Sequence, residues 1–254
     1  MTDLSRFSLE GKRIVVTGAN TGIGQGIAVS ALRAGAHVVG VGRSSMADTR
    51  GKTAALGGMF SEHHCDLADR SAAKAMLDAV WDAHGPVDGL VNNAGIIRRA
   101  DALEFDEADW DEVMDVNLRA SFFLCQRFGR RVVAEGRRGK IVNIASVLSL
   151  QGGIRVASYT ASKHGVLGIT RLLACEWAAR NINVNAIAPG YIVTNNTEAL
   201  RNDPDRSAAI LGRIPAGRWG EANDIGDAAV FLLAPASDYM HGALVPVDGG
   251  WLAR

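Results

Sequence analysis

Short apolar runs alternate with longer stretches of helical periodicity along almost the whole chain. Runs that are apolar on both sides and rich in β-branched residues predict buried strands. They lie at residues 13–17, 37–41, 89–92, 139–144, 182–187 and 244–247. Apolar residues at helical spacing predict helices at residues 23–34, 71–84, 109–135, 158–180 and 224–233. This alternation predicts an α/β fold.

Right-handed crossovers between such strands give a doubly wound (Rossmann) parallel sheet with helices on both faces. The 254 residues contain no repeat, no linker-like Pro/Ser tract and no charge run. We therefore expect a single domain over residues 1–254. Because ligands of such sheets bind beyond the carboxyl ends of the strands, cofactor and substrate sites should share that edge.

Composition and charge narrow the function classes. Hydrophobic residues make up 48% and charged residues 21% of the chain, which is typical of a globular protein. Lys+Arg and Asp+Glu both number 27, and this balance disfavours nucleic acid as a partner. No apolar run has transmembrane length, and the polar residues 1–12 contain no apolar signal core. These features predict a cytoplasmic protein with no membrane partner.

Cysteine and histidine spacing gives no metal or disulfide signature. Cys65, Cys125 and Cys175 are far apart, which predicts reduced, partly buried thiols. His63 and His64 are adjacent, so on a strand they would face opposite ways and chelate poorly. We predict no metal.

A glycine-rich turn, T-G-A-N-T-G-I-G at residues 17–24, lies between the first predicted strand and the first predicted helix. Glycines allow a tight turn and close approach of a pyrophosphate to backbone N–H groups, and the helix dipole favours the anion. The alternative is a glycine turn without a ligand. The strand–turn–helix setting favours phosphate binding.

Tyr159 and Lys163 lie at i and i+4, hence on one helix face. An ammonium about 4 Å from a phenolate stabilises it by roughly 4 kcal/mol at an effective dielectric of about 20, enough to lower a phenol pKa toward neutrality. Ser146 follows a predicted strand thirteen positions earlier and could bind a substrate oxygen. The alternatives are a solvated Tyr–Lys pair and a helix-capping serine. The combination of all three favours a site.

With these motifs the sequence resembles the classical short-chain dehydrogenase/reductase family from about residue 9 to 250. The matching residues are the glycine-rich turn, Asp66 after a strand, Asn92-Asn93-Ala94-Gly95, Asn117, Ser146, Tyr159, Lys163 and Pro189-Gly190. The family implies hydride transfer between a nicotinamide and a carbonyl or alcohol carbon. A tuned phenol then supplies general acid–base catalysis while the cofactor carries the hydride.

The resemblance also implies a role for each matching residue. Tyr159 is the acid/base, Ser146 polarises the carbonyl, and Asn117 supports a water-linked proton relay behind Lys163. Lys163 lowers the Tyr159 pKa and holds the nicotinamide ribose. The implied cofactor contacts are Gly18, Asn20, Thr21, Gly22, Ile23, Gly24, Asp66, Leu67, Asn93, Ala94, Gly95, Tyr159, Lys163, Pro189, Gly190, Ile192 and Thr194.

Cofactor preference is read from Gly42-Arg43 at the end of the second strand. NAD-preferring members usually carry an acid at the position of Gly42, which binds the ribose 2′-hydroxyl and repels a 2′-phosphate. Here the acid is absent, and Arg43 could pair with the phosphate. The sequence therefore favours NADP(H), with NAD(H) and an adenine-stacked Arg43 as the alternative.

Segments outside the shared motifs resemble the 2-dehydro-3-deoxy-D-gluconate 5-dehydrogenase group, also labelled 2-deoxy-D-gluconate 3-dehydrogenase. They are residues 92–99, 151–156, 189–197, 213–220 and 247–254. A sugar acid needs a cation for its carboxylate, and Arg155, one helical turn before Tyr159, is the preferred candidate. Gln151 and Asn195, with Asn196, could meet hydroxyls, and further carboxylate candidates are Arg98, Arg99 and Arg218.

The same resemblance implies a homotetramer packed through the helices at 109–135 and 158–180 and through the C-terminal strand and tail. We expect Trp219 and Trp251 to be core or subunit contacts. Two alternatives stay open: a reductase for a 3-oxoacyl thioester or a polyol, and a nucleotide-binding protein without activity. The retained Tyr159 and Lys163 argue against the second.

Overall fold

The strands form one parallel seven-stranded sheet in the computed structural model, which describes residues 4–254. The order along the sheet is β3-β2-β1-β4-β5-β6-β7. The strands are β1 Arg13–Thr17, β2 His37–Gly42, β3 Phe60–His64, β4 Gly89–Asn92, β5 Gly139–Ile144, β6 Ile182–Pro189 and β7 Leu244–Val247. Every neighbouring pair is parallel, so the predicted doubly wound sheet is confirmed.

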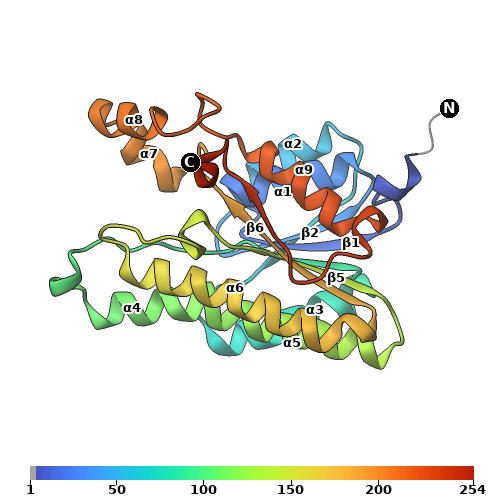
Figure 1. Ribbon diagram of the computed structural model, residues 1–254. Helices are drawn as coiled ribbons and strands as arrows, with labels where there is room; N and C mark the ends of the chain where they lie inside the picture. Colours follow the sequence, from blue (N-terminus) through green and yellow to red (C-terminus); the bar gives the residue numbers. More distant parts are fainter. Residues whose placement is uncertain (1–3) are drawn as a thin grey trace.

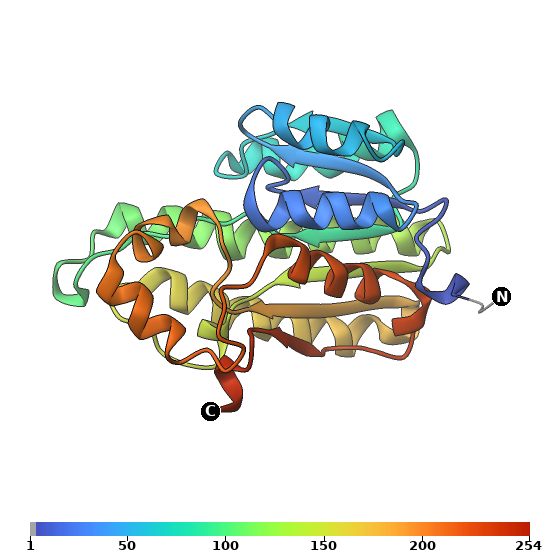
Figure 2. The ribbon, with the colours of Figure 1, turned by 90° about the horizontal axis from the view of Figure 1, so that it is seen from above.

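Helices cover both faces of this sheet (Figure 1). One face carries α1 (Gly22–Arg33), α2 (Ala47–Ala54) and α9 (Ala222–Leu233), and the other carries α3 (Arg70–His84), α4 (Glu107–Met114), α5 (Ala120–Ala134) and α6 (Ala157–Trp177). Two further helices, α7 (Asn195–Arg201) and α8 (Pro204–Leu211), lie together at one end of the molecule (Figures 1 and 2).

Two hydrophobic cores fill the space between sheet and helices, because strand side chains alternate between the faces. In β1, Val15 packs against the α3–α5–α6 side, whereas Ile14 and Val16 pack against the α1–α9 side. The strands are thus buried on both faces, as the continuous apolar runs predict.

The structure adds elements that the apolar pattern does not delineate. The edge strand β3 has the sequence FSEHH and is only partly buried, so it carries no apolar run. The short helices α2, α7 and α8 bury few residues and leave little periodic signal. The helix predicted at 109–135 begins at Glu107 and contains a π-helical turn, Asp115–Arg119, between α4 and α5.

The strand order reverses between β1 and β4, and this switch point is where an open α/β sheet forms its ligand crevice. Thr17, at the end of β1, joins the two strands: its Oγ1 accepts hydrogen bonds from the backbone N–H groups of Asn93 and Ala94, both at 3.0 Å. The Asn93 amide returns a bond to the Thr17 carbonyl at 2.9 Å. The crevice floor is therefore rigidly fixed to the sheet.

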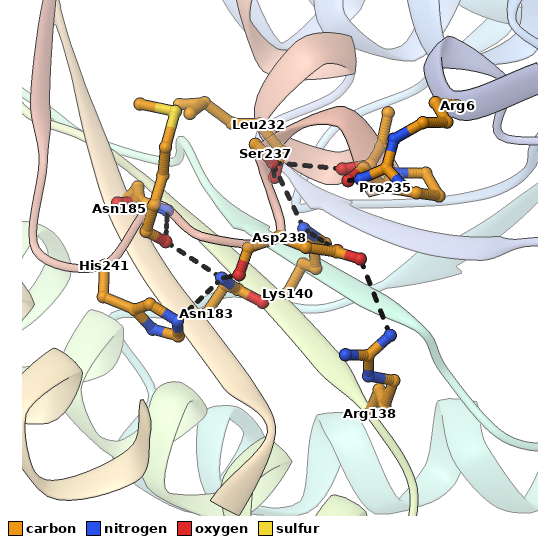
Figure 3. Close-up of polar contacts among 12 residues, drawn as sticks. Arg6, Arg138, Lys140, Asn183, Asn185, Leu232, Pro235, Ser237, Asp238 and His241 are labelled. Atoms are coloured by element: carbon orange, nitrogen blue, oxygen red, sulfur yellow. Dashed lines mark hydrogen bonds and ion pairs between the residues drawn. The ribbon is translucent and has the colours of Figure 1, made fainter. Parts of the chain in front are cut away.

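At the amino ends of the strands, away from the crevice, side chains of β5 and β6 hold the segment that leads into β7 (Figure 3). The Asn183 amide donates to the carbonyls of Asp238 and Met240, both at 2.9 Å. Lys140 forms an ion pair with Asp238 at 2.8 Å. No helix within residues 4–254 is long and apolar enough to span a membrane.

Candidate active site

A cavity of about 510 Å³ opens beyond the carboxyl ends of the strands around the switch point. Most of the predicted cofactor residues line it: Gly18, Asn20, Thr21, Gly22, Ile23, Arg43, Asp66, Leu67, Asn93, Ala94, Gly95, Tyr159, Lys163 and Thr194. The spacing of the motifs thus brings together residues from the connections that follow β1, β2, β3, β4 and β6 and from helix α6. Gly24, Pro189, Gly190 and Ile192 are not among its lining residues.

The glycine-rich turn has the backbone that the motif predicts. Gly18 and Gly22 have positive φ angles of 66° and 56°, which favour glycine. A Cβ on Gly18 would lie 2.9 Å from the Asn93 amide, and one on Gly24 would lie 2.1 Å from the Gly18 carbonyl oxygen. Gly24 therefore serves the close packing of α1 on the turn. The first turn of α1 opens on the cavity and offers N–H groups to an anion.

Pro189, Gly190 and Ile192 pack the region between β6 and β7. A Cβ on Gly190 would lie 2.6 Å from the Asp248 Cα, so only glycine fits there. Ile192 is buried in the core on the α1–α9 side. None of the three lines the cavity, and their direct contacts with the cofactor stay a prediction.

The structure shows the capping role considered for Ser146, while its contact with a substrate oxygen stays a prediction. Its Oγ accepts a hydrogen bond from the Leu148 N–H at 3.1 Å and so caps the short helical turn that follows β5. It also hydrogen-bonds the Tyr159 phenol. The Ser146 Oγ accepts from the Leu148 N–H, and this leaves its hydroxyl proton to donate to the phenol oxygen or to a substrate oxygen next to it.

Tyr159 and Lys163 lie on α6, with the Lys163 Nζ 5.5 Å from the centre of the Tyr159 ring. Burial lowers the pKa of Lys163 to about 8, and its Nζ donates to the Ile144 carbonyl at 2.6 Å. Burial raises the pKa of Tyr159; the Ser146 hydrogen bond and the charge of Arg99 oppose this rise. This differs from the predicted lowering by Lys163, because the ammonium is turned toward Ile144.

Asn117 lies within the π-helical turn, a feature that often marks functional sites. Its side chain pairs with the backbone of Ile96: Oδ1 accepts from the N–H at 2.8 Å, and Nδ2 donates to the carbonyl at 2.9 Å. Nδ2 also donates to the Ser162 hydroxyl at 3.2 Å on α6. Asn117 thereby joins the loop after β4 to the helix of Tyr159 and Lys163.

The arginines predicted to bind the substrate carboxylate differ in their exposure and in their ion pairs. Arg155 is exposed, has a φ of 62° and precedes α6, so the predicted one-turn spacing to Tyr159 is wrong. Arg98 is paired with Asp109 and Glu112, and Arg218 with Asp224.

Arg99 is exposed and does not line the cavity, but its positive charge opposes the rise in the Tyr159 pKa. Its Nη2 donates to the carbonyl of Asn196 in α7 at 3.1 Å, and among residues 4–254 it has no carboxylate partner. Asn195 and Asn196 line the cavity, whereas Gln151 does not. Spacing along the chain gives Arg99 no preference over Arg98 and Arg218, because its contact with Asn196 depends on how the loop after β4 folds.

The end of β2 offers a polar pocket without an acid at Gly42. Arg43 and Ser44 line the cavity, and the Asn20 amide donates to the Ser44 hydroxyl at 2.8 Å. Arg43 is largely exposed and lies 4.0 Å from Asp66, so this weak pair leaves the guanidinium available. Ser44 was not predicted; its position directly after Gly42-Arg43 is the signal that could have identified it.

Other side-chain chemistry is sparse. The three cysteines are free, with Cys65 and Cys125 buried and Cys175 exposed. Within the described residues 4–254, no group of three or more His, Cys, Asp or Glu side chains could hold a metal ion.

Comparisons with known proteins agree with this geometry. The family model described as Enoyl-(Acyl carrier protein) reductase matches residues 18–252. The 2-dehydro-3-deoxy-D-gluconate 5-dehydrogenase of Escherichia coli (strain K12) is 55% identical over 251 residues, covering 99% of each chain.

Two solved structures extend the likeness to the fold. An Agrobacterium tumefaciens protein with bound NADP, which carries the provisional name 2-deoxy-D-gluconate 3-dehydrogenase, is 63% identical with a TM-score of 0.94, covering 98% of this chain and 99% of that one. A gluconate 5-dehydrogenase from Burkholderia cenocepacia J2315, in complex with NADP and tartrate, is 37% identical with a TM-score of 0.91 and 99% coverage of both chains. On this identity, and on the position of Tyr159 and Lys163 in the same cavity as the glycine-rich turn, the chain belongs to the short-chain dehydrogenase/reductase family of NAD(P)-dependent enzymes.

Proposed function

We propose that this enzyme transfers hydride between NADP(H) and a keto or hydroxy carbon of a deoxy sugar acid of the 2-dehydro-3-deoxy-D-gluconate type, with both sites in one domain. The observation that carries the substrate class is Arg99. Its guanidinium has no carboxylate partner among residues 4–254 and donates a hydrogen bond to the carbonyl of Asn196, a residue that lines the cavity. A guanidinium binds a carboxylate with two parallel hydrogen bonds and so orients it.

The similarity in sequence supports the same substrate class. The relatives named 2-dehydro-3-deoxy-D-gluconate 5-dehydrogenase from Escherichia coli and Bacillus subtilis are 55% and 51% identical to this chain. The Burkholderia structure holds tartrate, a dicarboxylate, together with NADP. An arginine bound to the Asn196 carbonyl at the cavity wall is consistent with both.

The cavity fits a dinucleotide along its length. The first turn of α1 and the two positive-φ glycines suit a pyrophosphate, while Arg43, Ser44 and Asn20 suit a ribose 2′-phosphate. Gly42 presents no carboxylate that would repel this phosphate. We therefore assign NADP(H) as the preferred cofactor, which supplies or accepts the hydride.

In the reaction direction that oxidises an alcohol, Tyr159 acts as the base that takes the hydroxyl proton; in reduction it returns the proton to the developing alkoxide. Ser146 donates its hydroxyl proton to the same oxygen and stabilises the charge that develops there. Arg99 opposes the rise in the Tyr159 pKa caused by burial. We assign Lys163 to the ribose hydroxyls and Asn117 to the support of a water-linked proton path behind it.

We further propose a homotetramer in the cytoplasm. Phe123 on α5 and Leu172 on α6 are 43% and 49% exposed on the helical face. The helix through α4 and α5 is acidic in its first half (Glu107, Asp109, Asp111, Glu112 and Asp115) and basic in its second (Arg119, Arg127, Arg130 and Arg131). Antiparallel packing of two copies would pair opposite charges. Light scattering at two protein concentrations tests the tetramer.

The substrate is tested by parallel assays with 2-dehydro-3-deoxy-D-gluconate, gluconate, an uncharged polyol and a 3-oxoacyl thioester. We expect the highest kcat/KM for the deoxy sugar acid. A higher kcat/KM for the polyol or the thioester would overturn the proposed substrate class. Cofactor binding without turnover on any of the four would overturn the proposed activity.

A further inference from the structure

The α7–α8 segment, residues 195–211, borders the cavity but shares little of the two large cores. Helix α7 has no buried residue, and α8 has only Ile210. Asn195 and Asn196 nevertheless line the cavity, so the position of this segment decides the shape of the substrate end. Its attachment to the rest of the molecule therefore matters for substrate binding.

That attachment is a separate small cluster that contains Trp251. Trp251 is buried there with Val147, Ile210 and Ile214, and partly buried members complete the cluster: Tyr191, Leu200, Trp219 and Leu252. Val147 directly follows Ser146, and Ile210 belongs to α8. The cluster that contains this indole thus includes both the neighbour of a catalytic residue and a residue of α8.

The C-terminal turn is held in place from several sides. The Arg213 guanidinium lies 4.0 Å from the centre of a Trp251 ring, and the Ala216 N–H donates to the Gly249 carbonyl at 3.0 Å. The Asp248 carboxylate accepts from the N–H groups of Gly250 and Leu252 at 2.9 and 3.0 Å. Figures 1 and 2 show the C-terminal turn next to the end of the sheet that carries α7 and α8.

We propose that Trp251 is a positioning residue for the substrate: it fixes the α7–α8 segment against the turn after Ser146. The role is that of the aromatic body. The Trp251 Nε1 is buried without a hydrogen-bond partner among residues 4–254, so the N–H contributes no bond that holds the segment. Phenylalanine should replace tryptophan in this role, whereas alanine should not.

This inference rests on the proposed function only for the choice of substrate. The experiment compares Trp251→Ala and Trp251→Phe with the wild-type chain in three measurements: KM and kcat for the deoxy sugar acid, the Kd of NADPH, and amide hydrogen exchange over residues 195–214. We expect Trp251→Ala to raise KM about 10-fold, since small misplacements of a binding element are costly. Exchange in 195–214 should accelerate, with the NADPH Kd unchanged and Trp251→Phe close to wild type.

Met76→Ala is the matched control. Met76 is buried in the other core, between the sheet and α3, so its loss should destabilise the protein without a change in KM or in exchange over 195–214. An equal KM rise in Met76→Ala would assign the effect to general destabilisation and overturn the proposal. Unchanged KM and exchange in Trp251→Ala would overturn it directly.

The proposal can still be tested if Trp251→Ala does not fold or if the wild-type enzyme does not turn over the substrate. If Trp251→Ala does not fold, Arg213→Gln removes only the stacked guanidinium; faster exchange over 195–211 supports the proposal and unchanged exchange contradicts it. If the wild-type enzyme does not turn over the deoxy sugar acid, the proposed function fails. The exchange measurement then still tests the role of Trp251, because it needs no substrate.

Discussion

The two ends of the cavity are built differently. At the cofactor end, the turn after β1 is fixed to β4 by hydrogen bonds of Thr17 and Asn93, and the strands beneath are buried on both faces. At the substrate end, α7 buries no residue and α8 buries one. The sheet therefore prescribes where the cofactor lies, while a thinly attached segment and a few loop side chains select the substrate. Variants at the cofactor end should therefore change cofactor use, and variants at the substrate end should change substrate KM.

The largest effect is expected where the two ends meet, at Tyr159. Tyr159→Phe removes the proton donor and acceptor but keeps the ring, so kcat should fall by about 10²–10⁴-fold, the usual share of general acid–base catalysis. The Kd of NADPH, measured by fluorescence titration, should stay within about twofold. Wild-type turnover in this variant would show that Tyr159 is not the acid/base of the reaction.

The buried ammonium of Lys163 should reveal itself in stability against pH. Burial lowers its pKa from 10.5 to about 8, so below about pH 8 the folded state bears the full cost of a buried charge. Between about pH 8 and 10.5 the unfolded chain binds more protons than the folded chain, and this cost declines as pH rises. At about 1.4 kcal/mol per pKa unit, the whole change is about 3 kcal/mol.

Lys163→Met isolates this contribution, because it lacks the titrating group. Urea unfolding of both proteins at about pH 7 and about pH 9.5 should show the wild type gaining stability relative to Lys163→Met. The loss of the hydrogen bond to Ile144 is common to both pH values and cancels. An unchanged difference between the two proteins would show that the ammonium is not desolvated.

A smaller effect, confined to the substrate end, is expected at Arg99. Arg99→Ala should raise KM for the deoxy sugar acid by about 10–100-fold, the value of a hydrogen bond to a charged group. KM for an uncharged polyol should hardly change, and Arg99→Lys, which keeps the charge, should be intermediate. Equal increases for the acid and the polyol would show that Arg99 acts only through its bond to Asn196.

The smallest effect is expected at the far cofactor end. Gly42→Asp introduces a carboxylate that repels a 2′-phosphate, so the ratio of kcat/KM for NADPH to that for NADH should fall by about 10-fold. The new Cβ would lie 3.3 Å from the Asn20 Oδ1, so the Asn20 side chain has to shift slightly. An unchanged ratio would show that Arg43 and Ser44 bind no phosphate.

The same contrast explains what the sequence could predict. The glycine-rich turn, the strands and the Ser146–Tyr159–Lys163 set follow from local spacing within or directly after regular elements. The prediction for Arg155 is wrong because helical spacing does not hold outside a helix: α6 begins at Ala157, and Arg155 has a φ of 62°. Arg99 and Trp251 reach the substrate end only through loop and C-terminal packing, for which spacing carries no signal.

The central claim is hydride transfer between NADP(H) and a deoxy sugar acid. Its most direct test is the nicotinamide absorbance of the purified enzyme with 2-dehydro-3-deoxy-D-gluconate, run with NADP⁺ and NAD⁺ separately. The account predicts rapid turnover, with a higher kcat/KM for NADP⁺ than for NAD⁺. Cofactor binding without turnover of this acid would contradict it.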